Sequence, residues 1–189
     1  MEDLVEQIAL RVSLNEADIE LIREHFVQEE IKGKMNLLET GRIERNIYFL
    51  SKGFVRGFQI VNGKLVVGHL VDEKQFFCAI ESFTNETPSE DCFDTLTDTI
   101  VYKISKTNFD KLKAKSKKWS ELFEIVMNDS FSCKLNRARD FQSLSAKDRY
   151  LKFVEENPNL ALNVSVENIA SYLGMEPQSL SRIRGQVTF

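Results

Sequence analysis

The chain has 189 residues, of which 42% are hydrophobic, and a formal net charge of −4. A chain of this length and composition can bury a real core, as one large or two small domains, which excludes a disordered protein. No stretch approaches the roughly 20 apolar residues of a membrane span, the N-terminus is acidic unlike that of a signal peptide, and the three cysteines are too widely spaced for a disulfide framework or a zinc site. We therefore expect a cytoplasmic protein with reduced thiols, no bound metal and no membrane partner.

Residues 1–30 are expected to be helical. Leu4, Val5 and Ile8 share one helical face. A second helix is predicted after Ser13, because Glu16 lies three residues later and completes a capping-box pattern.

From residue 31 to about residue 104 the pattern changes to short apolar runs that are broken by glycine or polar turns. Asn62-Gly63 lies between two such runs and predicts a two-residue hairpin, because both turn positions need a positive φ. Several strands at this spacing indicate an antiparallel barrel or jelly roll. Residues 81–94 lack strand character and are expected to form a loop or short helix that interrupts the barrel.

A long helix with two apolar faces is predicted over residues 119–141. One face, expected to lie on the chain's own barrel, carries Phe123, Met127, Phe131, Leu135, Ala138 and Phe141. The other face is the predicted dimer interface and carries Trp119, Leu122, Val126 and Cys133. A helix with two apolar faces must bury both, most simply by pairing with a second copy, although burial inside one subunit is the alternative.

The last 25 residues predict a helix-turn-helix. Ser165 is a good N-cap for the first helix, Gly174 supplies a tight turn and Pro177 suits the first turn of the second helix. Side chains on the outward face of the second helix can hydrogen-bond bases or phosphates. The predicted DNA-binding residues are these side chains and Ser165: Ser165, Gln178, Ser179, Ser181, Arg182 and Arg184.

Charge favours the same interpretation. Residues 1–110 hold 12 basic and 20 acidic side chains, whereas residues 111–189 hold 13 basic and 9 acidic ones. The C-terminal part is therefore net positive, and we expect any polyanion to bind there. Glu176 is a contrary feature, because its carboxylate would lie close to DNA phosphate, and an ordinary αα-hairpin is the alternative.

With these features, nearly the whole chain resembles the Crp/Fnr family, the relatives of the cyclic AMP receptor protein. The resemblance rests on the glycines of the predicted barrel and on two segments, Asn168–Gly174 and Leu180–Arg184, of which the second is similar to the recognition helix of Bacteroidetes-type members. It implies an α+β fold with an N-terminal antiparallel β-roll or jelly roll like a cyclic-nucleotide-binding domain, a long dimerisation helix and a C-terminal helix-turn-helix of winged-helix type. We expect this last domain to be minimal, since the family usually continues into a small β-wing.

The resemblance also implies domain limits and partners. We expect an effector-type domain over residues 1–115, a dimerisation helix over 116–142 and a DNA-binding domain over 143–189. Base contacts in the family fall on Gln178 and Arg182, and a phosphate contact falls on Ser179. The implied partners are double-stranded DNA, a second copy of the chain, RNA polymerase and a small-molecule effector.

The effector pocket departs from the family pattern. Members that bind cyclic nucleotides carry a Gly-Glu pair and, later, an Arg-Ser pair, and these positions fall here on Cys78-Ala79 and Ser89-Glu90. The cation that neutralises the cyclic phosphate is missing, and burying an anion beside unpaired carboxylates is costly. We therefore expect a degenerate pocket that does not respond to cyclic AMP or cyclic GMP. Cys78 is either a redox sensor or, as its type favours, a small buried residue.

Two other classes of protein are alternatives. The first is a ligand-binding signalling module whose C-terminal helices mediate protein contacts. The second is a cupin-like metalloenzyme, which would need two or three histidines in the barrel, where His69 is alone. No catalytic motif is recognisable, so we expect no enzyme activity and no cofactor.

Overall fold

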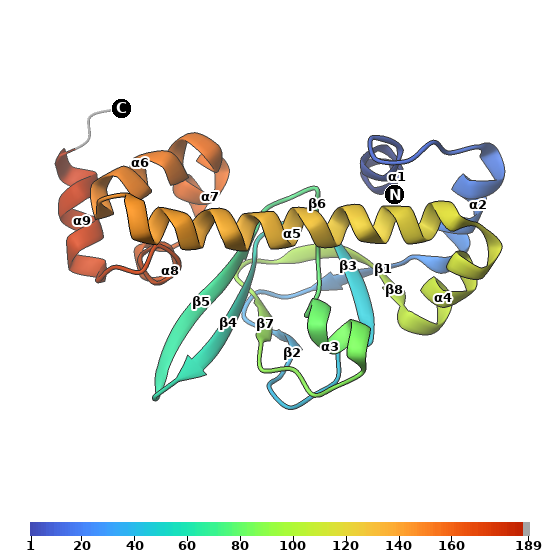
Figure 1. The fold of residues 1–189 in the computed structure, drawn as a ribbon, viewed down its shortest axis with the longest axis horizontal. Coiled ribbons are helices and arrows are strands. Elements are labelled where there is room, and N and C mark those ends of the chain that lie inside the picture. Colours follow the sequence, from blue (N-terminus) through green and yellow to red (C-terminus); the bar gives the residue numbers. More distant parts are fainter. Residues whose placement is uncertain (187–189) are drawn as a thin grey trace.

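The structure is a computed structural model that describes residues 1–186 (Figure 1). The N-terminal part contains the helices α1 (Glu2–Ala9) and α2 (Glu16–His25), followed by the strands β1 (Val27–Ile31), β2 (Asn36–Leu38), β3 (Asn46–Lys52), β4 (Val55–Val61), β5 (Lys64–Val71), β6 (Gln75–Phe77), β7 (Cys92–Thr95) and β8 (Thr99–Ser105), with the helix α3 (Ile80–Asn85) between β6 and β7. The C-terminal part is helical and contains α4 (Lys106–Lys115), α5 (Lys117–Ser143), α6 (Ala146–Glu156), α7 (Pro158–Asn163), α8 (Val166–Tyr172) and α9 (Pro177–Gln186).

The strands form two antiparallel sheets that face each other as a β-roll. Their strand orders are β1-β8-β3-β6 and β2-β7-β4-β5. Non-consecutive neighbours in both sheets show jelly-roll crossovers, so the predicted α+β fold with an antiparallel roll is confirmed. Strand β5 is an edge strand, a position that matters for the C-terminal helices.

The predicted hairpin is present between β4 and β5. Val61 pairs with Lys64, which leaves Asn62 and Gly63 as a two-residue turn with φ values of 52° and 75°. Figure 1 shows this hairpin projecting away from the rest of the roll.

Helix α5 is the longest helix and contacts both the N-terminal and the C-terminal part of the chain. In Figure 1 it runs across the β-roll, with the N-terminal helices near its first turns and α6–α9 at its other end. Its first part belongs to a core that it shares with the N-terminal helices, α4 and the β-roll. None of the helices within residues 1–186 is long and apolar enough to cross a membrane.

The predicted dimer face of α5 is contradicted at Trp119 and Leu122, and it stays a prediction at Val126 and Cys133. Trp119 and Leu122 are 0% and 4% exposed in the core of their own chain, and Val126 packs half-buried against the same core. Cys133 is exposed, but its Sγ lies 3.8 Å from the Tyr172 hydroxyl oxygen of the same chain. The sequence showed two apolar faces, but only the position of the roll and of the N-terminal helices decides which face is covered.

The opposite side of α5 remains uncovered in the single chain. Phe131 and Leu135 are 62% and 42% exposed, and Ala138 is exposed as well. These three residues, spaced by four and then three positions, lie on one side of the helix, and we call them the α5 stripe.

Two local expectations also need correction. The capping box of α2 is formed by Asn15 and Asp18, with reciprocal N–H bonds of 2.9 Å, and not by Ser13 and Glu16. The segment 81–94 contains strand β7 in addition to the expected short helix, and the additional helix α7 follows α6 directly. The predicted DNA-binding domain extends to residue 189, and its last three residues lie outside the described part.

Candidate nucleic-acid interface

Helices α8 and α9 form the predicted helix-turn-helix. Ile169, Ala170 and Leu180 have no exposed surface, which allows the two helices to cross closely. They pack on a C-terminal core that includes Tyr150 and Phe153 of α6. This hydrophobic packing fixes the orientation of α9 relative to α8.

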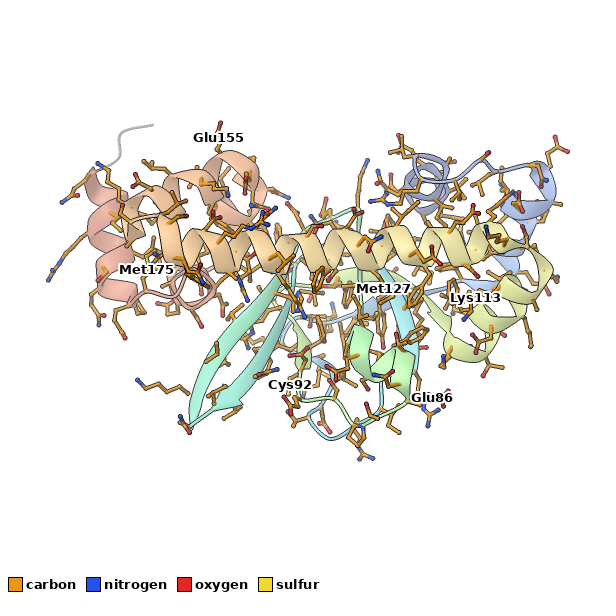
Figure 2. All side chains as sticks on the ribbon, in the orientation of Figure 1. Glu86, Cys92, Lys113, Met127, Glu155 and Met175 are labelled. Carbon is orange, nitrogen blue, oxygen red and sulfur yellow. The ribbon has the colours of Figure 1, made fainter. Side chains whose placement is uncertain are left out.

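The turn between the helices depends on Gly174. Its φ is +63°, a conformation that glycine adopts without cost, and a Cβ there would lie 2.8 Å from Cε1 of Phe141. The Met175 N–H then bonds the Ala170 carbonyl over 3.0 Å, and Figure 2 shows Met175 at this turn. The Glu176 carbonyl accepts from the N–H groups of Ser179 and Leu180, so α9 starts directly after the turn.

The outward side of α9 is free. Gln178, Ser179, Ser181 and Arg182 are exposed, and Arg184 is half-buried. Within residues 1–186, none of these five side chains forms a hydrogen bond or an ion pair. Hydrogen-bonding groups without internal partners are those that can bond bases and phosphates.

Ser165, the remaining predicted DNA contact, lies apart from this set. Its Oγ accepts from the Asn168 N–H over 3.4 Å and so caps α8. The pKa of Glu167 is lowered by its own backbone N–H and by a hydrogen bond from the Ser165 side chain. Glu167, in the first turn of α8, and Glu176, just before α9, are both exposed.

Helix α8 docks on the β4–β5 hairpin, a contact that sequence reasoning missed. The Ser171 hydroxyl accepts from the Val67 N–H over 3.0 Å and donates to the Leu65 carbonyl over 3.3 Å. Arg56, which forms an ion pair with Asp94, donates to Oδ1 of Asn168 over 2.8 Å. The only sequence signal for this contact is that Asn168 and Ser171 are polar residues of α8 that do not belong to its apolar face.

Of the four predicted effector-pocket residues, one lines a cavity. Cys78 lines a cavity of about 210 Å³ between the β-roll and α5, which we call the β-roll cavity, whereas Ala79, Ser89 and Glu90 do not. Ser89 is buried in a turn, where its Oγ donates to the Asp91 carbonyl over 2.9 Å, and Glu90 is exposed.

The backbone N–H of Ala79 already has a hydrogen-bond partner in the chain. Glu44 is 2% exposed, and its pKa is raised by burial, although hydrogen bonds from the N–H groups of Asn46, Ala79 and Arg45 oppose that shift. Burial also raises the pKa of the Cys78 thiol, with a further contribution from Glu44. A buried, protonated thiol is a poor nucleophile, which favours the small buried residue over the redox sensor.

Among the residues that the structure describes, no group of three or more His, Cys, Asp or Glu side chains is placed to hold a metal ion. The arrangement therefore offers two features for function: the free side of α9, and the β-roll cavity beside α5.

Comparison with known proteins identifies the fold. No protein-family model and no curated protein matches the chain. Among solved structures, it is similar to FixK2 from Bradyrhizobium japonicum, with a TM-score of 0.73 and 16% identity over 85% of this chain and 83% of that one. It is also similar to the c-di-GMP-responsive global regulator CLP from Xanthomonas campestris, with a TM-score of 0.73 and 14% identity over 91% of each chain. A protein assigned to the Crp/Fnr family of transcriptional regulators from Eubacterium rectale gives a TM-score of 0.70 and 16% identity over 92% of this chain and 83% of that one. The chain has the fold of these regulators, as the sequence resemblance predicted.

Proposed function

We propose that this protein is a sequence-specific DNA-binding transcriptional regulator of the Crp/Fnr type, which binds a roughly palindromic site as a dimer. The observation that carries the proposal is the free side of α9, where Gln178, Ser179 and Arg182 are exposed and unpaired within the described residues. A recognition helix with such a side can enter the major groove. The fold that the chain shares with known regulators supports the same function.

The proposed dimer forms through α5. The α5 stripe of Phe131, Leu135 and Ala138 has the alternating spacing of four and three residues by which two helices pack along a seam. Binding of a palindromic site requires that the two-fold dimer place its two copies of α9 about one DNA turn (~34 Å) apart.

We propose further that cyclic AMP and cyclic GMP are not effectors. No arginine stands at Ser89 or Glu90 to neutralise a cyclic phosphate, and the Ala79 N–H is occupied by Glu44. The β-roll cavity, at about 210 Å³, is smaller than the roughly 300–1,000 Å³ of pockets for drug-sized ligands. The proposal includes a cytoplasmic location, RNA polymerase as a partner and no enzymatic activity.

The test is selection of DNA sites by the purified chain from a random duplex library, followed by fluorescence anisotropy on the selected site. Arg182→Ala should weaken binding by about ten- to a hundred-fold, as expected for loss of a base contact. Affinity should fall as salt rises, because bound phosphates release counterions. The matched control is Arg23→Ala, which removes an exposed arginine of α2, and it should leave DNA affinity unchanged. Absence of salt-sensitive binding to any duplex contradicts the proposal.

A second candidate is a ligand-binding signalling module whose terminal helices mediate protein contacts. The docking of α8 on the hairpin favours it, because this helix already serves as a contact surface within the chain. Calorimetric titration with cyclic nucleotides, combined with the DNA-binding test, separates the two. Micromolar binding of a cyclic nucleotide would contradict the degenerate pocket, and such binding without any affinity for duplex DNA would support the module.

A further inference from the structure

The β-roll cavity is walled mainly by apolar side chains. Four phenylalanine rings line it, from Phe76 and Phe77 of β6, Phe93 of β7 and Phe123 of α5, together with aliphatic groups of β3, β5 and α5. Figure 2 labels Met127, one of the lining residues, on α5 where the helix crosses the roll. Such walls favour a flat apolar ligand, because aromatic rings pack well against one another.

One arginine brings positive charge to this cavity. Arg11, just after α1, lines it with its guanidinium carbon 5.8 Å from the centre of the Phe76 ring. Its Nη1 donates to the backbone and side chain of Gln7 over 2.8 and 3.1 Å, but its Nε is buried and has no hydrogen-bond partner within residues 1–186. A buried donor without an acceptor is unfavourable, and an arginine with free donors pairs well with a carboxylate.

Asp129, the carboxylate that would compete with a ligand for Arg11, has only a weak contact with this arginine. Asp129 of α5 also lines the cavity, with Oδ2 3.8 Å from Nη2 of Arg11, but its side chain is 64% exposed. A contact of this length at an exposed carboxylate contributes little, so Asp129 can turn to water when another acid arrives.

The other titratable base in the lining is neutral. His69 of β5 lines the cavity and is uncharged at neutral pH, because burial lowers its pKa to about 4. The cations Lys134 and Arg137 lower this pKa further, whereas Asp91 opposes the shift. The remaining polar lining groups, Gln75, Ser130 and Cys133, are neutral donors or acceptors.

We propose that the β-roll cavity binds a small aromatic monocarboxylate, whose ring lies among the phenylalanine side chains and whose carboxylate pairs with Arg11. The size agrees with this class, because a cavity of about 150 Å³ holds a benzene ring. The additional volume, in a cavity of about 210 Å³, accommodates a carboxyl group and a short linker.

Binding at this cavity can be communicated to α8 through one strand. His69, Leu70 and Val71 of β5 line the cavity, and the same strand holds Ser171 of α8 at Leu65 and Val67. The role of the ligand as an effector rests on the proposed DNA-binding function, but its binding does not.

The experiment is isothermal titration of the full chain with phenylacetate and with phenylacetamide, its neutral isostere. We expect phenylacetate to bind at least ten-fold more tightly than the amide, and hexanoate to bind more weakly than phenylacetate. Failure of both aromatic probes to bind overturns the proposal, as does equal affinity for acid and amide. Tighter binding of hexanoate overturns the aromatic assignment.

Variants assign the contact to Arg11. Arg11→Gln should abolish the preference for the acid, and Arg11→Lys should restore part of it. Asp129→Asn should tighten phenylacetate binding several-fold without affecting the amide, and because Asp129 is mostly exposed this variant should fold normally. Arg23→Gln is the control of matched chemistry on α2, and it should bind like the unmodified chain. A persisting preference in Arg11→Gln, or an unchanged affinity in Asp129→Asn, contradicts the assignment.

DNA binding measured without ligand separates the two proposals. A chain that binds DNA but not phenylacetate contradicts only the cavity assignment. A chain that binds phenylacetate but no duplex contradicts only the proposed function.

Discussion

At the scale of single residues, burial decides the chemistry of the β-roll cavity. His69 packs against the Phe93 ring, with ring centres 5.8 Å apart, and its lowered pKa reflects the cost of placing a charge in this setting. Cys78, on the same wall, is kept protonated for the same reason. Both side chains are thus neutral at physiological pH, and the cavity presents its charge through Arg11 and Asp129.

The titration of His69 predicts how stability depends on pH. Its pKa is about 4 in the folded chain against 6.5 for the ordinary side chain, so between these values the unfolded chain binds a proton that the folded chain does not. Stability should therefore be full above pH 6.5 and should fall as pH falls toward 4. From pH 7 to pH 5 we expect His69 to account for a loss of about 2 kcal/mol. Urea unfolding of the unmodified chain and of His69→Leu measures it, and an identical pH dependence in both would contradict the assignment.

Gly174 offers a second prediction at this scale, with a built-in control. Gly174→Ala should destabilise the chain by about 1–2 kcal/mol, because alanine is strained at a positive φ and its Cβ would meet the Phe141 ring. Gly185→Ala should have the opposite effect, about 0.5–1 kcal/mol of stabilisation, because Gly185 lies in α9 with nothing within 4 Å of an added Cβ. Thermal unfolding of the two variants measures both signs, and equal effects would show that the turn does not need glycine.

At the scale of elements, α8 covers an exposed sheet edge. β5 is an edge strand, and such strands leave N–H and C=O groups unpaired unless something covers them. Ser171 occupies the Val67 N–H and the Leu65 carbonyl, and Arg137 of α5 donates to the Gly68 carbonyl over 2.8 Å. Helix α8 and the long helix α5 thus cover the edge that the roll leaves open.

Removal of the Ser171 hydroxyl should uncover this edge. In Ser171→Ala the Val67 N–H loses its acceptor, so its hydrogen exchange should become about ten-fold faster, as expected for loss of a bond worth about 1 kcal/mol. Helix α8 itself should be unharmed, because alanine favours helix. Ser181→Ala, on the free side of α9, is the control and should leave exchange at Val67 unchanged. Amide hydrogen exchange at Val67, measured by NMR, tests this prediction. An unchanged Val67 rate in Ser171→Ala would mean that the docked arrangement of α8 is not populated in solution.

The elements that were predictable from sequence are those with local signals. Asn62-Gly63 specifies its hairpin, and Gly174 with Pro177 specifies the turn and the start of α9, because φ preferences act within a few residues. The covered face of α5 was not predictable, because Trp119 and Phe131 are equally apolar and only distant elements choose between them. The cavity, the Glu44 contact with Ala79 and the docking of α8 were missed for the same reason, since each joins segments far apart in the chain.

At the scale of the whole molecule, two long elements connect the candidate sites. Strand β5 borders the β-roll cavity and carries α8, while α5 lines the cavity with Val126 and Ser130 and presents the α5 stripe further along. A ligand that shifts either element would therefore change the position of the proposed DNA-binding helices or of the proposed dimer seam. Such coupling requires only that the two elements have more than one stable arrangement.

The oligomeric state tests the molecule as a whole. Phe131 and Leu135 are exposed in the single chain, so the double substitution Phe131→Glu/Leu135→Glu should leave the fold of the subunit intact but place like charges across the proposed two-fold seam. We expect the unmodified chain to sediment as a dimer and the variant as a monomer. Affinity for a palindromic duplex should then fall toward that for a half-site, because the two proposed recognition helices no longer bind together. Leu162→Glu is the matched control, since Leu162 of α7 is 81% exposed but lies outside the stripe, and it should remain dimeric. A double variant that stays dimeric by analytical ultracentrifugation would show that α5 is not the seam, and the palindromic site would then lose its structural basis.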